Sequence, residues 1–90
     1  MSSDEYDALS ELYSKLIKEN VNILQARGAR KLIVQANGFS KEVAWTYVIA
    51  EFSYEKPDGR VIWPKIAAEG RFLRDAVGGA LLLVRKIREA

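Results

Sequence analysis

In the segment VAWTYVIAEFSY, residues 43–54, apolar and aromatic side chains occupy odd and even positions alike. Its content of Val, Ile, Thr, Trp, Tyr and Phe favours a β-strand, which we predict from about Glu42 to Glu55. The alternative is a helix capped by Ser40, since four residues also fit a helical stripe: Trp45, Val48, Ile49 and Phe52. A strand of this composition is apolar on both faces, whereas a 90-residue chain builds a single core. One face is therefore expected to meet something other than that core.

Turn signals divide the rest of the chain into short elements. Asn-Gly at residues 37–38 is a strong hairpin signal, and KPDG at residues 56–59 combines the fixed φ of proline with a glycine. Gly28 suits the end of a helix and Pro64 the beginning of another. The predicted elements, in order, are a helix from Ser3 to about Ala26, strands Ala29–Ala36, Glu42–Glu55 and Arg60–Trp63, and a helix from about Lys65 to Arg88.

This order predicts a single domain of the α+β class that spans residues 1–90, with its elements arranged α-β-β-β-α. We expect a three-stranded antiparallel sheet. The N- and C-terminal helices are expected to pack on one face of that sheet, because a small protein has only one core and a flat sheet face lets a helix that contains Gly78-Gly79 approach closely.

The length of the hairpin loop decides which side chains share a face of the sheet. An even-length loop places odd positions of the second strand beside even positions of the first, and a bulge would reverse this. One face of the sheet is flat, because the central residues of the second strand on that face are small or short: Ala44, Thr46, Val48 and Ala50. This flat face is assigned to the helices. The opposite face then holds five aromatic and basic residues: Trp45, Tyr47, Arg30, Lys41 and Arg60. In the alternative, Trp45 and Tyr47 belong to the core and the assignment is inverted.

The chain contains no cysteine and no histidine, so disulfides, the commonest metal ligand and the commonest general base are missing. We therefore expect no metal, no cofactor and no catalysis, and keep an enzyme only as the third alternative. No segment reaches the ~20 apolar residues of a membrane span, and the acidic start, MSSDEYD, is unlike a signal peptide. The expected location is the cytoplasm, without a membrane partner.

Charge is distributed unevenly, because residues 25–90 carry twelve Lys or Arg against seven acidic residues while residues 1–24 are net acidic. Cations around exposed aromatics suit single-stranded DNA or RNA, whose bases stack on rings and whose phosphates bind Lys and Arg. The predicted nucleic-acid-binding residues are therefore Trp45, Tyr47, Arg30, Lys41 and Arg60. The alternative function is a homodimeric protein-interaction module without nucleic-acid affinity, built on that face or on the Ala/Gly-rich stripe of the last helix.

The segment KLIVQANGFSKEVAWTYVIAEFSYEKPDGRVIWPK, residues 31–65, together with the helix after it, resembles the archaeal ThermoDBP-related single-stranded nucleic-acid-binding proteins. The likeness lies in an antiparallel sheet backed by helices and in aromatic and basic residues suited to a binding cleft. The resemblance implies binding of single-stranded DNA or RNA with little sequence preference and without catalysis, and it gives that role to the same five residues. The few Asn and Gln and the many charged residues also suit a thermophile.

Overall fold

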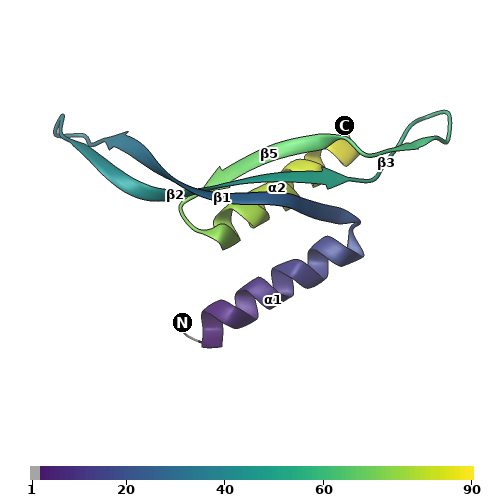
Figure 1. Ribbon diagram of the computed structural model, residues 1–90. Coiled ribbons are helices and arrows are strands. Elements are labelled where there is room, and N and C mark those ends of the chain that lie inside the picture. Colours follow the sequence, from purple (N-terminus) through teal and green to yellow (C-terminus); the bar gives the residue numbers. More distant parts are fainter. Residues whose placement is uncertain (1–2) are drawn as a thin grey trace.

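The structure is a computed structural model that describes the backbone of residues 3–90 and the side chains of residues 7–90, so most of the acidic N-terminal stretch lies outside the described side chains. Its elements are α1 (Ser3–Lys18), β1 (Val21–Val34), β2 (Ser40–Phe52), β3 (Tyr54–Glu55), β4 (Val61–Ile62), β5 (Lys65–Gly70) and α2 (Leu73–Glu89). An antiparallel sheet has the order β1-β2-β5, and β3 and β4 form a separate hairpin (Figure 1). The α+β class and the three-stranded antiparallel sheet are confirmed.

The hydrophobic core lies between one face of the sheet and the two helices. Strand β2 contributes Val48, Ala50 and Phe52 at alternate positions, each at most 1% exposed. Helix α1 contributes Leu16, and the buried residues of α2 are Ala76, Val77, Ala80, Leu81 and Val84. The assignment of this face of β2 to the helices is therefore confirmed.

The first helix is shorter than predicted, because it ends at Lys18 rather than near Ala26. Asn20 follows with a φ of 56°, a left-handed conformation that Asn tolerates after a helix end. The chain then enters β1, where Val21 and Ile23 pack at the core. The prediction of a helix up to Ala26 was wrong, because the helical spacing of apolar residues continues unbroken across this boundary and hides the end of the helix.

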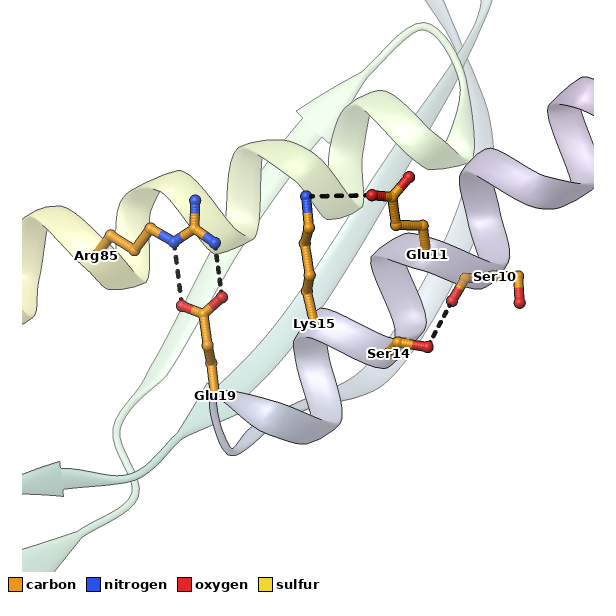
Figure 2. Close-up of polar contacts among 6 residues, drawn as sticks. All are labelled: Ser10, Glu11, Ser14, Lys15, Glu19 and Arg85. Atoms are coloured by element: carbon orange, nitrogen blue, oxygen red, sulfur yellow. Dashed lines mark hydrogen bonds and ion pairs between the residues drawn. The ribbon is translucent and has the colours of Figure 1, made fainter.

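An ion pair ties the end of α1 to α2 (Figure 2). Arg85 donates from Nε and Nη2 to the two carboxylate oxygens of Glu19, over 3.1 and 2.7 Å. These hydrogen bonds lower the pKa of Glu19 below its ordinary value and raise the pKa of Arg85. Within α1, Lys15 lies 4.0 Å from Glu11 in a second, longer ion pair. The two-pronged contact of Arg85 holds the helices against each other at the edge of the core.

The segment Lys65–Gly70 is a strand, β5, so the prediction that the last helix starts near residue 65 was wrong. Its side chains alternate, with Ile66 and Ala68 packed against the core and Ala67 and Glu69 exposed. Ala and Glu favour a helix in isolation, but pairing with β2 outweighs that weak local preference.

The predicted third strand, Arg60–Trp63, is reduced to Val61–Ile62, which pairs with β3 outside the main sheet. Helix α2 follows β5 after a sharp turn at Gly70. A Cβ at Gly70 would lie 2.6 Å from the Cβ of Asp75 and 2.8 Å from the amide nitrogen of Ala76. The close approach of strand and helix therefore requires glycine at this position.

The register of β1 against β2 is set by a three-residue loop. Gln35 donates its backbone N–H to the carbonyl oxygen of Phe39 over 2.8 Å, and the glycine before Phe39 has a φ of 86°. The odd loop length reverses the face assignment of β1, which was predicted from an even loop. Arg30 thus lies on the helix side of the sheet, while Lys31 lies on the side of Trp45.

The hairpin of β1 and β2 extends beyond the rest of the sheet as a two-stranded ribbon (Figure 1). Strand β5 pairs with β2 only from Thr46 to Glu51, so residues 30–44, which we call the arm, have no third strand beside them. Gly28 lies opposite Thr46 at the base of the arm. The arm and the β3–β4 hairpin project at opposite ends of the molecule, whose dimensions are 52 × 32 × 20 Å (Figure 1).

Candidate nucleic-acid interface

The sheet face opposite the helices, which we call the uncovered face, carries a hollow of about 340 Å³. A register shift between Ile23 and Gln25 turns the following odd-numbered residues of β1 toward this face. Arg27, Tyr47 and Glu69 then form one row across β1, β2 and β5. The neighbouring row consists of Gln25, Ile49 and Ala67. The hollow lies over these two rows and combines an aromatic ring, apolar side chains and charges of both signs.

Tyr47 is half-buried on β2, the middle strand of the sheet, and the exposed Arg27 lies directly across from it on β1. Among residues 7–90, no acidic side chain forms an ion pair with Arg27. A guanidinium beside an aromatic ring can bind a phosphate while the ring contacts a base. This pair is the part of the hollow best suited to an anionic ligand with a flat apolar face.

Trp45 is half-buried beside the hollow, and its ring is covered by a side chain of the same molecule. The Nζ atom of Lys31 lies 4.4 Å from the ring centroid and 2.8 Å from Oε1 of Glu69. Lys31 therefore reaches from β1 across Trp45 to β5. The buried Nε1 of Trp45 has no hydrogen-bond partner among the described residues. Glu69 lies near it, and the indole makes a minor contribution to the lowered pKa of the Glu69 carboxyl group. The face of the Trp45 ring that Lys31 covers becomes accessible only when Lys31 moves.

The bridge between Lys31 and Glu69 changes the titration of both groups. The hydrogen bond from Lys31 lowers the pKa of Glu69, and the same hydrogen bond raises the pKa of Lys31. Both shifts favour the charged forms, so the pair stays ionised across the neutral range. The carboxylate thereby neutralises the positive charge of Lys31 on the uncovered face.

The structure brings together three of the five predicted binding residues. Lys41, Trp45 and Tyr47 alternate along β2 and share the uncovered face. Arg30 lies on the opposite face, with its guanidinium 3.9 Å from Glu42, so its predicted place beside Trp45 was wrong.

Arg60 was also predicted beside these aromatic residues, and that placement was wrong too. It lies in the turn between β3 and β4, at the end of the sheet away from the arm (Figure 1). There its Nε donates to the carboxylate of Asp58 over 2.8 Å. The second hairpin does not join the main sheet, so no choice of loop length would have carried Arg60 to the uncovered face.

Arg27 and Lys31 are candidate binding residues that the sequence did not reveal. Arg27 was placed at the end of a helix, and Lys31 was placed on the helix side of the sheet by the even-loop register. The signal that could have placed Lys31 correctly is the Asn-Gly pair itself, because Gly38 in the left-handed region also closes a three-residue loop. Arg27 was missed for another reason, because the apolar pattern continues the first helix past Asn20.

The uncovered face has an excess of positive charge over its described length. Its cations are Arg27, Lys31, Lys41 and Lys65, and its carboxylates are Glu51 and Glu69. Glu51 accepts a hydrogen bond from the amide of Asn22 over 3.3 Å and lies opposite Lys65. Because the excess is small, removal of either carboxylate would raise the net positive charge of this face by a large fraction.

Comparison of the chain with family models, with curated proteins and with solved structures finds no match. Within the described part of the chain, no group of three or more acidic side chains is placed to hold a metal ion. Neither helix, over the residues described, combines the length and apolar character needed to cross a membrane. The site is therefore interpreted from its own geometry.

Proposed function

We propose that this chain is a non-catalytic protein that binds single-stranded DNA or RNA on the uncovered face. The observation that carries the proposal is the hollow in which half-buried Tyr47 lies across from Arg27, on a face with excess positive charge. Its volume of about 340 Å³ lies within the ~300–1,000 Å³ of sites that hold small organic groups. A nucleobase is such a group, and the strand that carries it is anionic.

In this proposal each residue has a separate role. A base stacks on the ring of Tyr47, and Arg27 binds the adjoining phosphate. Lys41 continues the cationic surface along the arm, and Trp45 becomes a second stacking surface when a phosphate draws Lys31 away from Glu69. Stacking and phosphate contacts do not read the edges of bases, so the expected sequence preference is small. A cytoplasmic location, without a cofactor, belongs to the same proposal.

The test measures, by fluorescence anisotropy, the binding of labelled oligo-dT and oligo-U to the wild type and to Tyr47→Ala. Loss of one stacked base, at ~1–3 kcal/mol, weakens binding roughly 5-fold to 150-fold. Tyr13→Ala is the matched control, because Tyr13 is 42% exposed but lies on α1, away from the sheet face. Tyr47→Phe keeps a ring and is expected to retain most of the affinity.

The two oligonucleotides also determine whether DNA or RNA is preferred. Absence of binding by the folded wild type would contradict the proposed function. Equal affinities of wild type and Tyr47→Ala would contradict the assignment of the stacking site.

A further inference from the structure

The arm exposes a run of large apolar side chains that no other part of the described chain covers. Leu32 is 62% exposed, Ile33 38%, Val34 68% and Phe39 71%. All four lie within residues 32–39, at the free end of the ribbon. Leu32 and Val34 lie on the helix side of the ribbon and Ile33 lies on the opposite side, so apolar side chains flank this stretch of β1 on both faces.

The same segment has an unpaired backbone edge. Strand β1 is the outermost strand of the sheet, and β2 pairs with only one of its sides. The hydrogen bond from Gln35 to Phe39 sets the alternation of the ladder, so odd-numbered residues of the arm direct their N–H and C=O groups toward β2. The groups of Arg30, Leu32 and Val34 therefore point outward, where another strand can pair with them.

This edge is complementary to itself. When two copies pair antiparallel about a two-fold axis at Leu32, that residue lies opposite its own copy, Lys31 opposite Ile33, and Arg30 opposite Val34. No like charges then face each other. An axis at Arg30 or at Lys31 would place two identical cations opposite one another, which is destabilising. The arrangement of charges thus selects the apolar part of the arm for self-pairing.

We propose that a second copy of this chain pairs antiparallel with the outer edge of β1 on the arm, about a two-fold axis at Leu32. The two sheets then form one sheet of the order β5-β2-β1-β1-β2-β5, and the axis keeps both uncovered faces on the same side. A single pair of short strands buries less than the ~800 Å² per partner of a standard interface, so the dimer is expected to dissociate on dilution. The pairing does not depend on nucleic-acid binding.

The experiment is sedimentation equilibrium of the full chain without nucleic acid, over a range from micromolar to millimolar protein. The apparent mass of the wild type is expected to rise with protein concentration from 10.1 kDa toward twice that value. Leu32→Lys is expected to raise the dissociation constant at least about 10-fold, because it places two charges at the axis. Leu32→Pro removes an N–H that points outward, so it blocks pairing between copies without breaking the β1–β2 ladder.

Two control variants locate the interface. Leu82 on α2 is 58% exposed and Ile17 on α1 is 79% exposed, so Leu82→Lys and Ile17→Lys add the same charge at comparably exposed apolar sites outside the arm. Both are expected to dimerise like wild type, and far-ultraviolet circular dichroism checks that each variant is folded. The proposal is overturned if wild type stays monomeric at millimolar concentration, if both Leu32 variants still dimerise, or if either helix variant dissociates the dimer.

Discussion

Glu69 is the residue whose removal we expect to strengthen nucleic-acid binding. Its carboxylate holds the ammonium of Lys31 over 2.8 Å at the edge of the hollow, and both side chains are partly exposed. Glu69→Gln removes a negative charge from the uncovered face and frees Lys31 for a phosphate. A gain of affinity is informative because general damage to the fold would weaken binding instead.

The size of the gain follows from counterion release. On single strands each neutralised phosphate contributes ~0.7 to the slope of the logarithm of affinity against the logarithm of salt concentration. One further phosphate contact through Lys31 therefore raises affinity roughly 8-fold at about 50 mM salt and roughly 3-fold at about 200 mM salt. The salt dependence becomes steeper by the same ~0.7.

The assay is anisotropy of labelled oligo-dT, titrated at several salt concentrations. Glu11→Gln is the matched control, because it removes the same charge from a lysine ion pair on α1, 4.0 Å long, away from the sheet. Wild type and Glu11→Gln are expected to share one salt slope. An unchanged slope in Glu69→Gln would refute the role of Lys31. An equal gain in Glu11→Gln would show that net charge, rather than this face, controls binding.

Two further predictions concern the fold. Phe52→Ala, which empties a fully buried site, is expected to lower the free energy of unfolding by ~3–5 kcal/mol in urea denaturation. Phe39 is 71% exposed, so Phe39→Ala is expected to change this free energy by less than about 0.5 kcal/mol in dilute protein. Equal effects of the two substitutions would contradict the core described above. Arg85 lowers the pKa of Glu19 from 4.5, so the stability that wild type has over Glu19→Gln is present above about pH 4.5 and disappears as pH falls through the lowered pKa. Urea denaturation at neutral and strongly acidic pH checks this, and a constant difference between the two proteins would refute it.

The parts of the fold that follow from the sequence are those decided by neighbouring residues. Strand β2 was predictable because β-branched and aromatic residues dominate it, and its alternation placed Val48, Ala50 and Phe52 in the core. Both turns were also predictable, since Gly38 and Gly59 adopt φ values of 86° and 88° that other residues rarely take. Lys41, Trp45 and Tyr47 shared a face for the same local reason.

The parts that failed depend on distant pairing. A helical stripe of apolar residues runs past Asn20, and only the contact of Val21 with the core shows that β1 has begun. Lys65–Gly70 reads locally as a helix and is a strand because β2 lies beside it. The partners of Trp45 across the sheet depend on one residue of loop length, so Arg30 and Lys31 exchanged places.

The row of residues at the base of the arm has a mechanical consequence. Thr46 lies between Gly28 of β1 and Gly70 of β5. Gly70 is packed against the start of α2, whereas a Cβ at Gly28 would have no neighbour within 4 Å, so only the β1 side of this row lacks support. The sheet also narrows here from three strands to two, and stiffness falls where strands and packed side chains end. We therefore expect bending to be concentrated on the Gly28 side of this row, and the strands of the arm to separate locally at a free energy smaller than that of the whole domain. Its free end can change direction while Phe52 and the core stay fixed.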